Sequence, residues 1–188
     1  MSIYEMKNRT KTYLAGDWTG DKDLITEIRD WNKDKNLGLS FTDVHELTSS
    51  SDSSLNCSIK SSLRKRLSIC KTFVLIVGEK TRNLHSGACY LCENYRNNLG
   101  KPYCVNSFYN QIDNRSFVEF ECDMALKDYR DGKLKNIVVI YNGMEKPNKS
   151  LCLDSLRNVG IHIGSDVLIN GKIYWNYNKI KNAIVNKL

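Results

Sequence analysis

Two uninterrupted apolar runs constrain the fold of this chain more than any other feature of its sequence. They belong to the segments Thr72–Val77 and Asn136–Tyr141, and both are rich in β-branched residues. Because side chains alternate between the two faces of a strand, an apolar residue at every position indicates a strand that is covered on both faces. Such strands are typical of parallel sheets with helices on each side. The sequence therefore predicts an α/β fold.

Three weaker strands and four helices complete the predicted order. The weaker strands are expected at Thr12–Gly16, Leu39–Val44 and Gly160–Ile163. Apolar residues that recur every three or four positions predict helices at residues 21–34, 58–68, 116–131 and 177–188. In the third of these, Ser116 and Glu119 form a capping box. Strands that alternate with helices predict one mainly parallel sheet of about five strands.

The length of the chain, 188 residues, is that of a single domain, which we predict to span residues 1–188. Residues 79–115 lie between the third predicted strand and the third predicted helix. This segment is far longer than a usual connection between a strand and a helix. It contains several cysteines, and we expect it to be a Cys-rich insertion with some structure of its own.

Charge and hydropathy argue against binding to nucleic acid or to a membrane. The chain has 28 basic and 21 acidic residues, and the excess of +7 is spread along it rather than gathered in a stripe. The one dense basic cluster is expected to be a solvated helix face, with a phosphate or acidic-partner patch as the alternative. It comprises Lys60, Arg64, Lys65, Arg66 and Lys71.

The hydropathy pattern predicts a cytoplasmic protein. The longest wholly apolar run has five residues, whereas a membrane-spanning helix needs about 20. The first residues are polar and show no apolar core of a secretory signal.

Polar residues follow the predicted strands at the ends where parallel sheets bind ligands. Asp17 and Trp18 follow the first strand, Asp43 and His45 lie at the end of the second, and Glu79 follows the third. We predict that these residues line one rim of the sheet and bind a small polar ligand. The alternatives are that acidic residues such as Asp17 and Asp21 cap the following helix and that His45 is an ordinary surface residue.

One carboxylate of the third predicted helix lies on its apolar side. Glu121 is two positions from Glu119 and from Asp123, which belong to a charged stripe, and so points about 200° away from each. It falls instead on the stripe of Phe117 and Phe120. A carboxylate on an apolar face is costly unless it is paired or hydrogen-bonded. Glu121 is therefore either a buried structural carboxylate held by Ser, Thr or Arg, or a functional one with a shifted pKa at a pocket.

These features together resemble a known family. The order of strands and helices, the helix start Phe117-Val118-Glu119-Phe120-Glu121 and the closing segment Trp175–Ile180 are similar to bacterial TIR-like domains of the Thoeris anti-phage system. The resemblance covers about residues 10–185, and it implies a flavodoxin-like fold of three layers. The long segment 79–115 departs from the family pattern.

The resemblance also implies a function. Catalytic members of the wider TIR group split NAD at the nicotinamide–ribose bond, and some cyclise the product into a signal nucleotide. Their key residue is a glutamate on the helix after the third strand, and Glu121 occupies that position here. It would stabilise an oxocarbenium-like ribose, with Trp18 stacking on a ring and Asp17 and Asp43 lining the pocket. NAD is then the substrate, no cofactor is required, and the family resemblance implies a homo-oligomer.

Two other functions are compatible with the sequence. Tyr13-Leu14-Ala15-Gly16 is similar to the first strand of nucleoside deoxyribosyltransferases, which share the flavodoxin-like layout and use a glutamate nucleophile. Many TIR domains, in contrast, act without catalysis as protein-interaction modules in signal transduction. An enclosed and fully paired Glu121 would favour this second alternative.

A metal site is a further alternative within the insertion. The pattern His85-x3-Cys89-x2-Cys92-x11-Cys104 contains four possible zinc ligands, but only one Cys-x2-Cys pair. A structural zinc ion would help to order such a segment. The favoured interpretation is that these cysteines are small packing residues and that no metal is bound.

Overall fold

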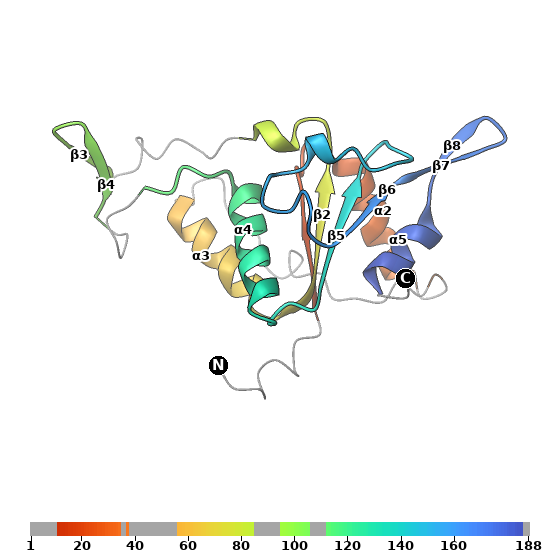
Figure 1. Ribbon diagram of the computed structural model, residues 1–188, viewed down its shortest axis with the longest axis horizontal. Helices are drawn as coiled ribbons and strands as arrows, with labels where there is room; N and C mark the ends of the chain where they lie inside the picture. The colour runs from red at the N-terminus through yellow and green to blue at the C-terminus, as the bar shows by residue number, and fades with distance from the viewer. Residues whose placement is uncertain (1–10, 35–36, 38–55, 85–94, 106–111, 186–188) are drawn as a thin grey trace.

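The structure, a computed structural model, describes residues 11–34, 37, 56–84, 95–105 and 112–185. Its centre is a four-stranded sheet with the strand order β1-β2-β5-β6, in which every pairing is parallel (Figure 1). The strands span Lys11–Ala15 (β1), Cys70–Val77 (β2), Asn136–Tyr141 (β5) and Ile161–Gly164 (β6). The predicted α/β class and the parallel sheet are confirmed.

The two apolar runs form the central strands of this sheet. Every residue of β5 is buried, and so are residues 72–77 of β2. The two strands pair from Thr72 beside Asn136 to Val77 beside Tyr141. Their side chains enter two separate apolar clusters, one on each face of the sheet. Burial on both faces is thus the reason for the uninterrupted apolar sequence.

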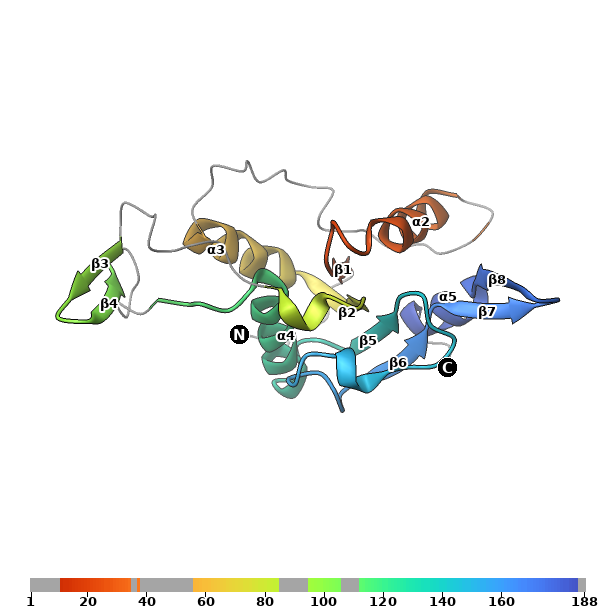
Figure 2. The same ribbon diagram turned by 90° about the horizontal axis from the view of Figure 1, so that it is seen from above.

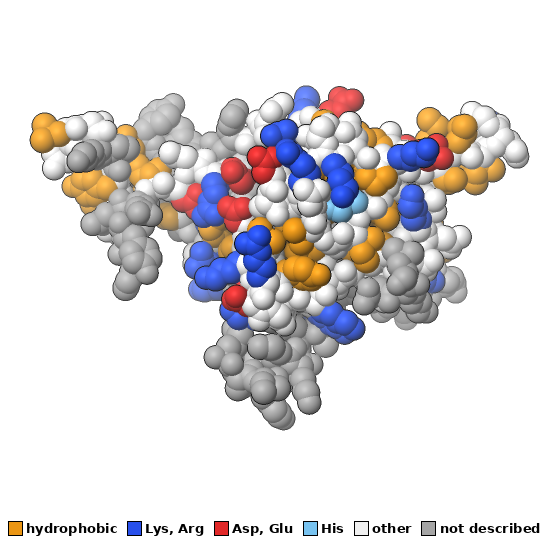
Figure 3. Space-filling model, in the orientation of Figure 1, with side chains coloured by type: hydrophobic (Ala, Val, Ile, Leu, Met, Phe, Trp, Pro, Cys, Tyr) orange, Lys and Arg blue, Asp and Glu red, His pale blue; other side chains and the backbone are white. Residues whose placement is uncertain are grey.

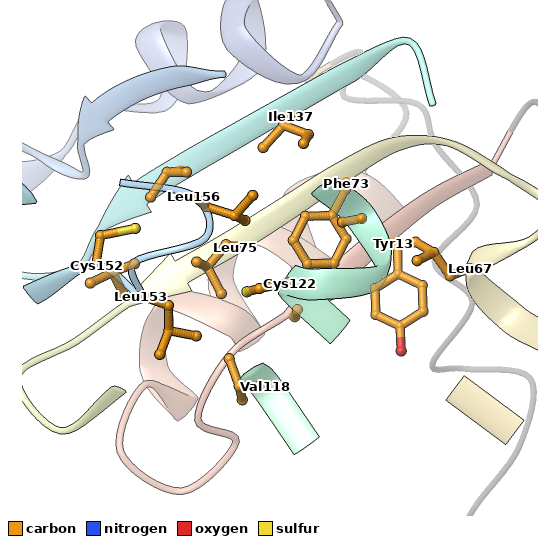
Figure 4. Packing of buried hydrophobic residues seen from close by; sticks show 14 of the residues in the cluster. Tyr13, Leu67, Phe73, Leu75, Val118, Cys122, Ile137, Cys152, Leu153 and Leu156 are labelled. Atoms are coloured by element: carbon orange, nitrogen blue, oxygen red, sulfur yellow. The ribbon is translucent and has the colours of Figure 1, made fainter. Parts of the chain in front are cut away.

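Helices cover both faces of the sheet and make a three-layer structure (Figures 1 and 2). On the left of the sheet in both views lie α3 (Asn56–Leu67) and α4 (Phe117–Arg130); on the right lie α2 (Lys22–Lys33) and α5 (Tyr177–Ile184). Tyr13, Phe73 and Leu75 of the sheet pack against Val118 and Cys122 of α4 (Figure 4). This layering is consistent with a flavodoxin-like layout. Of these helices, none is long and apolar enough to cross a membrane.

Two predicted elements lie outside the described residues in whole or in part. The strand expected at Leu39–Val44 is one of them, so the described sheet has four strands rather than the five expected. The helix predicted at residues 177–188 is the other, because its last three residues, 186–188, lie outside the described residues. Within segment 79–115, the described residues form a short 3-10 turn, η2 (Thr81–Asn83), and a hairpin of β3 (Tyr95–Asn98) and β4 (Lys101–Cys104).

A second hairpin was not predicted. β7 (Asp166–Ile169) and β8 (Lys172–Trp175) pair antiparallel across a turn at Asn170-Gly171, where both residues have positive φ. Asn-Gly is the strongest short signal for such a turn, and it is present in the sequence. The flanking residues are apolar on both faces of the hairpin and therefore do not alternate. Leu168 and Ile173 are more than half exposed.

We expect Gly160→Ala to destabilise the fold far more than Gly132→Ala. Both glycines have positive φ, 85° and 69°, so alanine costs about 1 kcal/mol at either position from backbone strain. A Cβ at Gly160 would also lie 2.4 Å from the carbonyl oxygen of Ile137 in β5, whereas nothing lies within 4 Å at Gly132. The total loss at Gly160 should therefore reach about 3 kcal/mol. Urea denaturation measures both losses, and equal values would contradict the close approach of Gly160 to β5.

Candidate active site

The N-terminal end of α4 is held by hydrogen bonds from two sides. The side chain of Ser116 accepts a hydrogen bond from the backbone N–H of Glu119 at 3.1 Å, which is half of the predicted capping box. The buried ammonium of Lys60, on α3, donates to the carbonyl oxygens of Asp113 and Arg115 at 2.8 and 2.7 Å. The prediction that Lys60 lies on a solvated helix face is therefore wrong. This lysine anchors the segment before α4 to α3.

Glu121 lies in the second turn of α4 and faces the sheet. It is 4% exposed, and the hydroxyl of Tyr13 in β1 donates to its Oε1 at 2.5 Å. Figure 4 shows the side chain of Tyr13 beside Leu67 of α3. The predicted position of Glu121 on the inner face of its helix is confirmed. The donor that the structure shows is a tyrosine from the sheet, a residue type that we did not expect there.

Burial dominates the electrostatics of this pair. Loss of water raises the pKa of Glu121 to about 7, although the hydrogen bond from Tyr13 and the charge of Arg66 on α3 act in the opposite direction. Burial also raises the pKa of Tyr13, and the nearby Glu121 adds to this effect. A carboxyl group with a pKa near neutrality can donate or accept a proton at the pH of a cell.

A pocket of about 270 Å³ opens beside α4 at the carboxyl edge of the sheet. The first turns of α4, the segment after β2 and the loop between β5 and β6 supply its walls. The lining residues are Arg82, Leu84, Ser116, Glu119, Asp123, Leu153, Asp154 and Ser155. Figure 3 shows acidic and basic side chains gathered over this end of α4. Glu121 does not line this pocket, whereas Glu119, two positions earlier, does.

Three charged side chains of the pocket, Arg82, Asp123 and Asp154, form ion pairs. Arg82 lies 3.2 Å from Asp154 and also donates to the carbonyl oxygen of Ser150. Arg115 pairs with Asp123 and with Asp113, each at 2.7 Å. The pairing with Arg115 holds the pKa of Asp113 well below its usual range. The pocket thus presents the half-exposed guanidinium of Arg82 and three carboxylates to a ligand. These carboxylates belong to Glu119, Asp123 and Asp154.

The predicted rim residues that the structure describes lie at the carboxyl ends of their strands. Asp17 accepts a hydrogen bond from the backbone N–H of Thr19 at 3.0 Å and so closes the turn after β1. Trp18 is 38% exposed, and the guanidinium of Arg29 lies 4.4 Å from the centre of its ring. Glu79 is exposed after β2. Asp43 and His45 lie outside the described residues.

A second buried carboxylate lies at this edge, and its burial is not predicted from the sequence. Asp21 is 3% exposed and is the N-cap residue of α2, but its side chain makes no capping hydrogen bond, so the alternative of a side-chain cap is not observed. Its Oδ1 instead accepts a hydrogen bond from Nδ2 of Asn142, after β5, at 2.9 Å. Burial raises the pKa of Asp21, against the hydrogen bond from Asn142, and the nearby Asp17 raises it further.

The possible zinc ligands are only partly described. Cys104 ends β4 as a half-buried free thiol, while His85, Cys89 and Cys92 lie outside the described residues. Among the residues that the structure does describe, no group of three or more His, Cys, Asp or Glu side chains is placed to hold a metal ion.

Comparison of the chain with protein-family models and with curated proteins finds no match. The similarity to TIR-like domains therefore depends on the sequence motifs alone.

We expect Glu121→Gln to stabilise the protein at alkaline pH. The folded pKa of about 7 lies above the ordinary value of 4.5. The folded state therefore binds more protons than the unfolded chain in this interval, and stability falls as the pH rises from 4.5 to 7. The full penalty, present above pH 7, is roughly 3 kcal/mol. Glutamine retains an oxygen for the Tyr13 hydroxyl and carries no charge.

Urea denaturation at pH 5 and pH 8.5 measures this effect. The stability of Glu121→Gln relative to wild type should grow by about 2–3 kcal/mol between the two pH values. Glu119→Gln, on the solvent side of the same helix, is the matched control and should show no such growth. A difference between Glu121→Gln and wild type that does not change with pH would show that Glu121 is not ionising in a buried site.

Proposed function

We propose that this protein is a TIR-like signalling enzyme that binds NAD at the carboxyl edge of its sheet and breaks the nicotinamide–ribose bond. The observation that carries the proposal is the charged pocket beside the first turns of α4, the helix that also contains Glu121. Parallel sheets bind ligands beyond the carboxyl ends of their strands, which is where this pocket lies. The motifs shared with TIR-like domains support the choice of NAD among nucleotides.

The chemistry of the pocket suits the parts of a dinucleotide. The carboxylates of Glu119, Asp123 and Asp154 can accept hydrogen bonds from ribose hydroxyls. The guanidinium of Arg82 offers donors to a pyrophosphate. The N-terminal end of α4 adds partial positive charge on the same side. At the same edge, the exposed ring of Trp18 provides a surface for stacking a base or the nicotinamide.

Cleavage of the nicotinamide–ribose bond requires a carboxylate that stabilises positive charge more than it requires a general acid. Nicotinamide leaves a cationic precursor as a neutral molecule, so the ribose that remains resembles an oxocarbenium ion. A nearby carboxylate stabilises that charge. We assign this role to Glu121 on the strength of the family motif, and assign ribose binding to Glu119, which lines the pocket. Because Glu121 faces Tyr13 and does not line the pocket, this role requires that α4 or its surroundings rearrange when the substrate binds.

The enclosure of Glu121 favours a second candidate function. A carboxyl group that is 4% exposed and hydrogen-bonded by a buried tyrosine is also what a structural role requires. On that interpretation the protein is a TIR-like interaction module that signals without catalysis. Under either candidate, we propose that it works as a homo-oligomer in anti-phage defence. Cyclisation of the product into a cyclic ADP-ribose-type signal belongs to the catalytic candidate.

Nicotinamide release from NAD tests the catalytic proposal. Purified wild type, Glu121→Gln and Glu119→Gln are incubated with NAD, and nicotinamide and new nucleotides are followed by chromatography. Loss of the charge that stabilises the transition state should lower the rate of Glu121→Gln about 100- to 1,000-fold. Glu119→Gln should mainly raise KM, because it removes a contact to the ribose. The mass of the second product separates hydrolysis from cyclisation.

Other results of this assay would contradict different parts of the proposed function. Full activity in Glu121→Gln together with loss in Glu119→Gln would move the catalytic role to Glu119. No release by wild type, at high protein concentration and in lysate of phage-infected cells, would leave the interaction module as the function. Exchange of bases between deoxynucleosides by the wild type would instead indicate a deoxyribosyltransferase.

A further inference from the structure

One oxygen of the second buried carboxylate makes no hydrogen bond to the residues that the structure describes. Asp21 is 3% exposed, and its Oδ1 accepts the hydrogen bond from Asn142. Its Oδ2 is buried and, within the described part of the chain, receives no hydrogen bond. An unsatisfied buried acceptor costs stability, and folded proteins retain few of them without a functional reason.

Residues that follow three adjacent strands surround this carboxylate. After β1, the backbone N–H of Asp21 donates to the carbonyl oxygen of Asp17 at 2.8 Å. After β2, the backbone N–H of Gly78 donates to the hydroxyl of Thr81 at 2.8 Å. A Cβ at Gly78 would lie 2.2 Å from Oδ1 of Asp21, so the carboxylate occupies the space that a side chain would need. Asn142, after β5, supplies the third contact.

We propose that Oδ2 of Asp21 is a ligand-binding acceptor that takes a hydroxyl group of the ribose of a bound nucleotide. This inference rests on the proposed function in placing a nucleotide at the carboxyl edge of the sheet. A ribose hydroxyl is a neutral donor that can approach a carboxylate at a strand end and replace its missing hydrogen bond. A metal ion fits less well, because Asn142 turns its amide nitrogen toward the carboxylate rather than a second oxygen ligand.

A ligand-binding role predicts that affinity and stability respond in opposite ways to one substitution. Asp21→Asn retains an oxygen for Asn142 and removes a buried charge, so the folded protein should not lose stability. The amide nitrogen that replaces Oδ2 is a donor and cannot accept from a ribose hydroxyl. A partner from the chain itself would instead make the same substitution destabilising, because that partner would lose its acceptor.

The test uses ADP-ribose as the probe, because it contains no nicotinamide and its binding does not depend on bond cleavage. Isothermal titration calorimetry measures its affinity for wild type and Asp21→Asn. Asp23→Asn, in the exposed first turn of the same helix, is the matched control. We expect Asp21→Asn to bind about 10- to 100-fold more weakly with an unchanged or higher Tm, and Asp23→Asn to bind as wild type does.

A second variant changes the position of the carboxylate and leaves its chemistry unchanged. Gly78→Ala retains the carboxylate but pushes it from its place, and should weaken ADP-ribose binding in the same way. Equal affinity of wild type and Asp21→Asn would overturn the inference. A lower Tm of Asp21→Asn with unchanged affinity would do so too, as would absence of binding by wild type at millimolar ADP-ribose. Binding that depends on Asp21 without nicotinamide release would refute only the catalytic proposal.

Discussion

The burial of β2 and β5 on both faces is the constraint on which the rest of the molecule depends. Because both faces of these strands are apolar, the chain must place helices on each side of the sheet. The helices then cover both faces, so polar groups gather mainly at the strand ends. At the carboxyl ends the chain collects Asp17, Asp21, Glu79 and Asn142. The location of the candidate site thus follows from the need to bury the central strands.

The two buried carboxylates differ in how the chain satisfies them. Glu121 lies between the sheet and the α3–α4 layer, where Tyr13 donates to it at a short distance. Asp21 lies at the start of α2 and is satisfied at one oxygen only among the described residues. Burial raises the pKa of both groups. A satisfied buried carboxylate is compatible with a structural role as well as a catalytic one, whereas an unsatisfied one is explained more directly by a ligand.

The sequence predicted the elements that periodicity controls. The central strands follow from their uninterrupted apolar runs, and the four helices and the inward position of Glu121 follow from a spacing of about 3.6 residues. The described residues confirm them. The pocket could not be predicted, because Arg82 and Asp154 are 72 positions apart and meet only through the fold. Local sequence also could not decide whether the side chain of Asp21, at the N-cap position of α2, caps that helix. Its true partner, Asn142, follows a strand that lies far along the chain.

The low-dielectric surroundings of Glu121 have two opposing effects on its ability to stabilise positive charge. A low local dielectric strengthens the attraction between a carboxylate and a developing oxocarbenium charge. It also raises the pKa to about 7, so that a large fraction of the protein holds this group as a neutral acid near pH 7. The ionised form would return in a complex that brings a cationic nicotinamide riboside beside it, because an opposite charge lowers the pKa of a carboxyl group. Burial of Glu121 in the free protein is therefore compatible with catalysis, provided that the substrate supplies the positive charge that keeps the carboxylate ionised.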